Sequence, residues 1–94
     1  MKFSYTYFLT NKNKTVLYTG ATGNLKNRIK LHIEGKGAKF TKKYSAFELV
    51  YYEKFEKYED AFSREKQLKA WRKSWKWDLI KKFNPGLKNL YLEL

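Results

Sequence analysis

The spacing of apolar residues restricts the fold of this chain more than any other feature. Short, aromatic-rich stretches at residues 3–9, 15–19 and 47–52 have the length and composition of strands. From Tyr58 the spacing becomes helical and remains so to about Phe83. A chain that combines such strands with a long helical region is expected to be an α+β domain.

The connections between these segments predict the order of the elements. A polar turn at residues 11–14 joins the first two strands into a hairpin. Residues 20–23 break the strand pattern, and Asn24 can then cap a helix. Gly35 and Gly37 are expected to end that helix.

The second half of the chain begins with a basic loop at residues 36–43, which leads into the third strand. The helical region that follows stops at Asn84-Pro85-Gly86, and the apolar tail at residues 87–94 is expected to pack back onto the domain. The predicted order is β-β-α-β-α-α in a single domain over residues 1–94. This is a small α+β fold, in which helices flank a mostly antiparallel three-stranded sheet.

Positive charge is the strongest signal in the composition. The 94 residues include 21 Lys and Arg against 9 Asp and Glu, a formal net charge of +12. Such a field attracts polyanions, so nucleic acid is the expected partner, in preference to an anionic membrane surface. No apolar stretch approaches the roughly 20 residues of a membrane span. The N-terminus does not resemble a signal peptide, and the expected location is the cytoplasm.

The residue types exclude most kinds of hydrolytic site. The chain has no cysteine and a single histidine, which rules out thiolate sites and sites with two histidines. No serine has the flanking sequence of a nucleophile elbow. The run Gly20-Ala21-Thr22-Gly23 lacks the Gly-Lys-Ser/Thr ending of a phosphate-binding loop. Tyrosine, arginine, histidine and glutamate side chains remain as candidates.

Five segments, in order along the chain, carry a resemblance to a known family. They are Tyr5-Thr6-Tyr7, Tyr18-Thr19-Gly20, the run from Gly20 to Arg28 followed by His32, the run from Gly35 to Thr41, and the run from Ala61 to Lys69. Together they resemble the GIY-YIG nucleases over residues 5–85, especially the small stand-alone, single-domain branch related to the N-terminal nuclease domain of excinuclease. The first motif has Tyr-Thr-Tyr in place of Gly-Ile-Tyr and the second has Thr in place of Ile. Both tyrosines and Gly20 are kept.

The resemblance implies a divalent-metal-dependent endonuclease that acts on DNA rather than RNA, in repair or recombination. The site residues that it implies are Tyr7, Tyr18, Arg28, His32 and Glu65, with Gly20 and Asn84 as additional members. In that scheme Glu65 holds one Mg²⁺ or Mn²⁺ ion and Arg28 binds the scissile phosphate. Tyr7 is the general base with Tyr18 beside it, and His32 orients water or protonates the leaving group.

Lysines in the basic loop are expected to hold the nucleic-acid backbone, a role that needs charge but little geometry. They are Lys36, Lys39, Lys42 and Lys43. Phe40 and Tyr44, which lie among them, can stack on a splayed base or anchor the loop to the core. A second basic track is predicted on the last helices, at Lys69, Arg72, Lys73 and Lys76.

Ordinary structural roles compete with these assignments. Glu65 stands between Arg64 and Lys66, where it would serve as a surface ion-pair partner. A lone histidine is often a packing residue, and tyrosines in strands are ordinarily core or cross-strand partners. The alternative function is therefore a catalytically inactive, basic nucleic-acid-binding module, for DNA or RNA, that retains the fold.

Overall fold

A computed structural model, which describes residues 2–94, places a three-stranded antiparallel sheet at the centre of the protein. The strands are β1 (Ser4–Thr10), β2 (Leu17–Thr22) and β3 (Glu48–Phe55), in the spatial order β2-β1-β3. The predicted α+β fold is confirmed. β1 is the central strand, so β2 and β3 are the two edges of the sheet.

The hairpin turn explains why β2 begins later than residue 15. The Oδ1 atom of Asn11 accepts hydrogen bonds from the backbone N–H groups of Thr15 (2.8 Å) and Val16 (3.2 Å). These two donors are therefore used within the turn, and Lys14 adopts a positive φ of 59° to close it. Because the strand continues to Thr22, Gly20 lies inside β2 instead of ending it, which corrects the expected break at residues 20–23.

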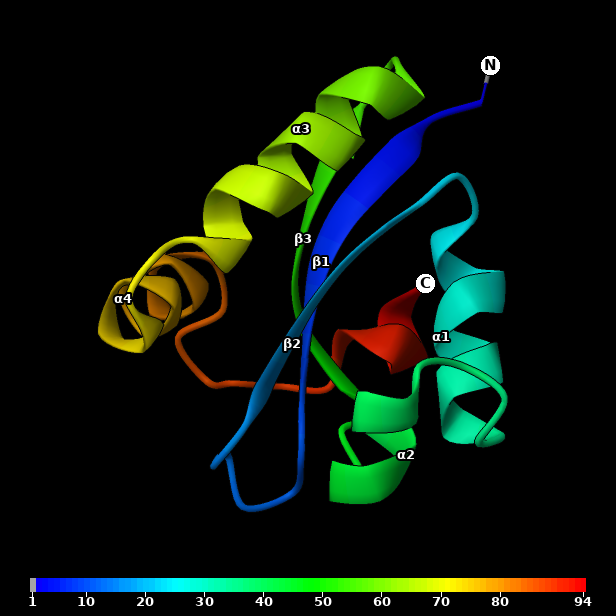
Figure 1. Ribbon diagram of the computed structural model, residues 1–94. Coiled ribbons are helices and arrows are strands. Elements are labelled where there is room, and N and C mark those ends of the chain that lie inside the picture. Colours follow the sequence, from blue (N-terminus) through cyan, green and yellow to red (C-terminus); the bar gives the residue numbers. More distant parts are fainter. Residues whose placement is uncertain (1) are drawn as a thin grey trace.

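Helices cover both faces of the sheet (Figure 1). One face carries α1 (Leu25–Ile33), α2 (Lys39–Tyr44) and the short 3-10 helix η1 (Leu90–Glu93). The opposite face carries α3 (Tyr58–Lys69) and α4 (Lys73–Phe83). Within residues 2–94, none of these helices is long and apolar enough to cross a membrane.

One part of the helical prediction needs correction. The segment expected as a basic loop contains α2, a helix that ends at Ser45 in the left-handed conformation, with a φ of 53°. The helical region expected from Tyr58 to Phe83 consists of two helices, as in the predicted order, and they are separated at residues 70–72, where Arg72 is extended with a ψ of 146°. The second helix therefore starts in a new direction.

The alternation of side chains along the strands creates a separate core on each face of the sheet. The α1 face buries Tyr7, Leu9, Leu25, Ile29, Ala46 and Leu49. The face covered by α3 and α4 buries Phe8, Val50, Tyr51, Leu68 and Ile80. Leu90 and Tyr91 of the tail pack against the first cluster, so the predicted return of the tail onto the domain is confirmed.

Leu68 is the residue through which α3 is held on its face of the sheet. It is fully buried. We predict that Leu68→Ala lowers the free energy of unfolding by about 2–5 kcal/mol, through lost burial and the cavity left behind. Urea denaturation measures this loss. Ser63→Ala, an exposed change on the same helix, is the control and should stay within about 0.5 kcal/mol of wild type.

Candidate active site

Tyr7 and Gly20 face each other across the β1–β2 pair and form the base of the site. The Tyr7 ring lies so close over Gly20 that a Cβ atom there would overlap the phenol oxygen and the ring carbon that bears it. A residue with any side chain would therefore displace the ring. Glycine lets a buried tyrosine, only 2% exposed, lay its hydroxyl against the edge strand.

His32 contacts this hydroxyl from the face of the sheet that α1 covers. Its Nε2 atom lies 3.0 Å from the Tyr7 oxygen, and the side chain is 1% exposed. Gly37 makes room for the imidazole, because a Cβ atom there would overlap the Nδ1 side of the ring. The only histidine of the chain is thus buried, but it is engaged with Tyr7 instead of being a simple packing residue.

Thr41 in α2 determines which nitrogen of His32 carries the proton. The Thr41 hydroxyl donates to the Ala38 carbonyl (2.8 Å), and its oxygen lies 2.9 Å from Nδ1 of His32. Because that hydroxyl proton is already used, the oxygen accepts from Nδ1–H. Nε2 then has no proton and accepts from the Tyr7 hydroxyl. A directed chain runs from Tyr7 through His32 and Thr41 to a backbone carbonyl.

Tyr18 connects the buried pair with the protein surface. Its ring centroid lies 5.3 Å from that of His32 and 6.4 Å from that of Tyr7. On its other side, 6.0 Å away, is Phe40, which is itself 4.8 Å from Tyr44. The result is a continuous row of aromatic rings from the interior to the exposed face of α2.

Charges from both faces of the sheet reach the Tyr7 hydroxyl. Burial raises the pKa of Tyr7 above its ordinary value of 10.0, with further upward contributions from Tyr18 and Glu65, while the positive charge of Arg28 opposes them. Burial, followed by Arg28, lowers the pKa of His32 from 6.5. His32 is therefore neutral at pH 7, as its acceptor role requires.

Glu65 comes to the site from α3. That helix is fixed to β1 by the Thr6 hydroxyl, which donates to the Ala61 carbonyl (2.6 Å), one helical turn before Glu65. Glu65 is only 9% exposed and its Oε2 lies 3.1 Å from Nζ of Lys69. Its neighbour Arg64 turns instead to Glu53, 3.0 Å away. Glu65 is thus a largely buried carboxylate with one ion-pair partner, and not the solvated residue that its flanking charges indicated.

Asn84 has a structural environment. Its amide nitrogen donates to the carbonyls of Val50 (3.1 Å) and Lys88 (2.9 Å), and its Oδ1 accepts from the Lys88 N–H (3.1 Å). These contacts hold it against β3, whereas Tyr7 leans towards β2 at the opposite edge of the sheet. A role for Asn84 in the site stays a prediction.

The predicted basic residues of the α2 region lie at the protein surface. The four lysines of the α2 region, Lys36, Lys39, Lys42 and Lys43, are all exposed. Next to them is an open cavity of about 430 Å³, lined by Phe40, Tyr44, Trp71, Lys73 and Lys76 among others. Burial and the charges of Lys69 and Lys73 lower the pKa of Lys76, a sign of crowded positive charge. Such a surface favours a bound polyanion.

The sequence prediction named Tyr7, Tyr18 and His32, which the structure brings together, but it gave Thr41 no role and gave Gly37 only the end of the first helix. Both lie in the Gly35–Thr41 run that carried part of the resemblance, so the signal was present without a function attached. Their contribution depends on the way the chain folds back from α1 into α2, which brings them beside His32.

The structure thus brings together a tyrosine hydroxyl and a neutral imidazole, both under the electrostatic influence of Arg28, with a contribution from Glu65 at Tyr7. Residues 3–84 match the model of the GIY-YIG catalytic domain. The chain therefore belongs to the GIY-YIG family, a family of nucleases.

Relatives of similar length support this membership. A UPF0213 protein of Pediococcus pentosaceus is 42% identical over 86 residues, which cover 92% of this chain and 90% of that protein. A UPF0213 protein of Clostridium perfringens is 44% identical over 77 residues, or 82% of each chain. The solution NMR structure of a UPF0213 protein from Bacillus halodurans is similar with a TM-score of 0.58, 33% identity, and coverage of 93% and 92% of the two chains. These names state no activity, substrate or pathway.

The Tyr7–Gly20 contact can be tested with two glycines of one segment. We predict that Gly20→Ala destabilises the protein by about 1–3 kcal/mol, because the new methyl group forces the Tyr7 ring aside. Gly23→Ala is the matched control, since a Cβ atom there meets nothing within 4 Å. Urea denaturation compares the two variants. Equal stability of both would contradict the close contact.

Proposed function

We propose that this protein is an endonuclease that hydrolyses phosphodiester bonds in DNA with the help of one divalent metal ion. The observation that carries the proposal is the buried Tyr7 hydroxyl, which donates to neutral His32 beside Arg28 and Glu65. Family membership supports nuclease chemistry, and the resemblance of the motifs supports DNA over RNA.

The direction of the hydrogen bonds gives Tyr7 a way to act as a base. A phenol with a raised pKa does not lose its proton unaided at neutral pH. Here Tyr7 can take a proton from the attacking water while its own proton passes to Nε2 of His32. The imidazolium that forms keeps its Nδ1–H on Thr41. The hydroxide bonds to phosphorus as the bond to the leaving oxygen breaks, and that oxygen takes a proton from solvent.

Arg28 is suited to hold the phosphate under attack. Its side chain is exposed on α1, one turn before His32, and its charge is felt by both Tyr7 and His32. A guanidinium can bind two phosphate oxygens at once, which fixes the phosphorus relative to the base. Tyr18 lies beside both residues of the relay and can position the water or the phosphate.

The residues at the site fit a metal ion that retains most of its water ligands. Among the residues that the structure describes, no three His, Cys, Asp or Glu side chains come together, so no closed protein cage is present. Glu65 supplies a single, mostly buried carboxylate whose charge is felt at Tyr7. Mg²⁺ is commonly bound through one or two carboxylates, water and substrate phosphate. The ion would supply positive charge against the negative charge that develops on the phosphate oxygens.

The substrate would approach over α2. The exposed lysines there offer charge to the backbone, and Phe40 and Tyr44 offer ring faces to a displaced base. The aromatic row from Phe40 through Tyr18 leads to the relay, so a strand bound on this surface would pass close to Tyr7.

Removing the charge of Glu65 is the decisive test of the proposal. We predict that Glu65→Gln abolishes the cleavage of labelled DNA in Mg²⁺ or Mn²⁺ but leaves DNA binding in EDTA within about two-fold of wild type, since most binding charge lies elsewhere. Glu59→Gln, an exposed change on the same helix, is the control and should retain activity. RNA versions of each substrate test the preference for DNA.

Two results would contradict the endonuclease. Cleavage that continues in EDTA, or in Glu65→Gln, would remove the metal role of Glu65. Salt-sensitive binding without products from any DNA or RNA structure would instead favour the inactive binding module.

The role of Thr41 gives a second test, based on pH. Thr41→Val removes the acceptor for Nδ1–H, so His32 can change to the Nε2–H tautomer, which cannot accept from Tyr7. We predict at least a 10-fold loss in kcat, within the roughly 10²–10⁴-fold that positioned proton transfer contributes. Thr41→Ser keeps the hydroxyl and should restore most of the rate.

The pH profile and the tautomer distinguish this role from a purely structural one. In wild type, kcat should fall as the pH drops through the lowered pKa of His32, because the imidazolium accepts no proton. Thr41→Val should flatten this acid limb. Imidazole ¹⁵N shifts should show Nδ1–H in wild type and in Thr41→Ser. An Nε2–H signal in wild type would overturn the relay.

A further inference from the structure

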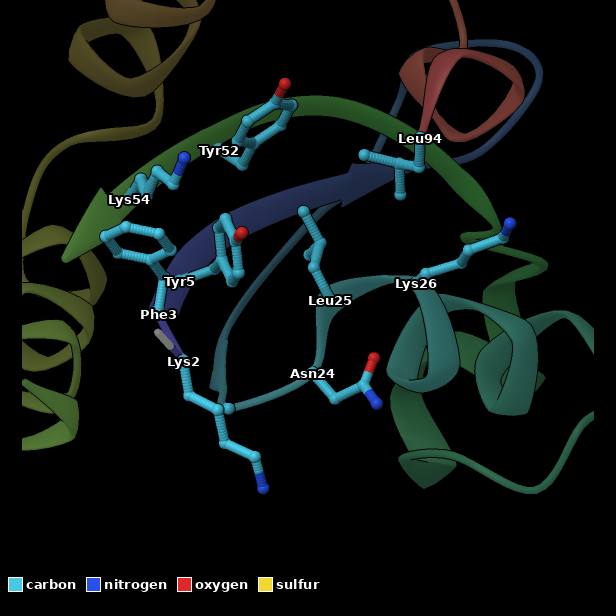
Figure 2. A pocket seen from close by; sticks show the side chains of 10 residues that line it. Lys2, Phe3, Tyr5, Asn24, Leu25, Lys26, Tyr52, Lys54 and Leu94 are labelled. Carbon is cyan, nitrogen blue, oxygen red and sulfur yellow. The ribbon is translucent and has the colours of Figure 1, made fainter. Parts of the chain in front are cut away.

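A second cavity lies on the α1 face, at the end of the sheet where β1 begins (Figure 2). It has a volume of about 500 Å³ and opens to solvent. Side chains from β1, β3, the start of α1 and the C-terminal residue Leu94 surround it. No member of the relay from Tyr7 to Thr41 lines this cavity, which is therefore separate from the catalytic centre.

Aromatic rings form much of the wall of the cavity. Tyr5 and Tyr52 are neighbours on β1 and β3, with their ring centroids 6.1 Å apart and their planes at 73°. Phe3 lies just before β1, and Nζ of Lys54 is 4.1 Å from the centre of its ring. All three rings are only partly buried, so they present area to a ligand. Planar, apolar ligand groups fit such a wall.

The rim of the cavity is positively charged. Lys2, Lys26 and Lys54 come from three different segments, and all are exposed. None of the ten residues that line the cavity is Asp or Glu. Figure 2 shows Lys2 and Lys26 extending outward from the cavity on different sides. A ligand with a flat body and an anionic group outside it would satisfy both the wall and the rim.

The position of the cavity connects it with the phosphate-binding side of the site. Tyr5 and Tyr7 are two residues apart on β1 and so lie on the same face of the sheet. Asn24, at the start of α1, comes one helical turn before Arg28. If Arg28 binds one phosphate of a nucleic-acid strand, the neighbouring nucleotide of that strand can reach this cavity.

We propose that the cavity binds one unpaired nucleotide of the substrate strand, next to the phosphate at Arg28. The base would stack against the Tyr5, Tyr52 and Phe3 rings, and the lysines would hold the flanking phosphates. An unpaired nucleotide is favoured over a paired one because bases in a duplex already stack on both faces and their edges alone are accessible. The inference rests on the proposed function and extends it to the kind of substrate: a strand with an unpaired nucleotide near the scissile bond.

Binding in EDTA tests this inference apart from catalysis. The probes are a duplex with a short single-stranded tail, 2-aminopurine being its first unpaired base, and the same duplex fully paired. RNA versions of both are also used. The proteins are wild type, K26Q/K54Q and, as a control with equal loss of charge, K12Q/K30Q, whose lysines are exposed outside the cavity. Tyr52→Leu adds a test of stacking, with its melting temperature measured alongside.

The tailed duplex should bind wild type at least about five-fold more tightly than the paired duplex, and its 2-aminopurine fluorescence should be quenched by stacking. K26Q/K54Q should lose this preference. The slope of log K against log salt for the tailed probe should fall by about 0.7 for each lysine that contacts the single strand. K12Q/K30Q should weaken both probes equally or not at all. Tyr52→Leu should remove the quenching.

Equal binding of tailed and paired duplex by wild type would overturn the proposal. An equal loss of affinity for both probes in K26Q/K54Q would also overturn it, because the lysines would then contribute only general positive charge. Quenching of a free 2-aminopurine nucleotide by wild type, with no preference for the tailed duplex, would assign the cavity to a small nucleotide instead. Cleavage in Mg²⁺ is scored separately, so a failure of the proposed hydrolysis leaves the binding result readable.

Discussion

The close contact between the Tyr7 ring and Gly20 is the constraint from which the rest of the site follows. A buried tyrosine in the central strand would ordinarily stand upright in the core, with its hydroxyl among apolar side chains. Without a side chain at the facing position, the ring can lie over β2 and bring its oxygen to the edge strand. There it meets His32 from one face of the sheet and the charge of Glu65 from the other.

The arrangement around this atom places opposite demands on its neighbours. His32 must stay neutral to accept a proton, and burial together with Arg28 lowers its pKa in the required direction. Arg28 also opposes the burial and the negative charge that raise the pKa of Tyr7, so the same guanidinium keeps His32 neutral and makes the Tyr7 hydroxyl easier to deprotonate. Thr41 adds no charge but fixes the direction of the hydrogen bond between Tyr7 and His32. The Thr41 hydroxyl, on the six-residue helix α2, thereby sets the tautomer of His32 on α1.

Sequence reasoning was sufficient for the architecture, because aromatic-rich segments and helical spacing are local signals. The sequence prediction was less accurate where a side chain takes up backbone N–H groups. Asn11 uses the N–H groups of Thr15 and Val16, so β2 begins only at Leu17. The bonding of Thr41 depends on contacts between segments that no spacing pattern encodes. The motif order identified Tyr7, Arg28, His32 and Glu65 as a group, but their burial and bonding directions required the three-dimensional fold.

The burial of His32 also has a thermodynamic consequence. Since its pKa in the folded state lies below the ordinary 6.5, the unfolded chain binds a proton at this residue more readily than the folded protein does. The contribution of His32 to stability is therefore complete above pH 6.5 and declines as the pH falls from there through the lowered value. Acid would thus act twice on one residue, by occupying the nitrogen that receives the Tyr7 proton and by favouring the unfolded chain. Protonation of His32 is therefore linked to the stability of the folded protein.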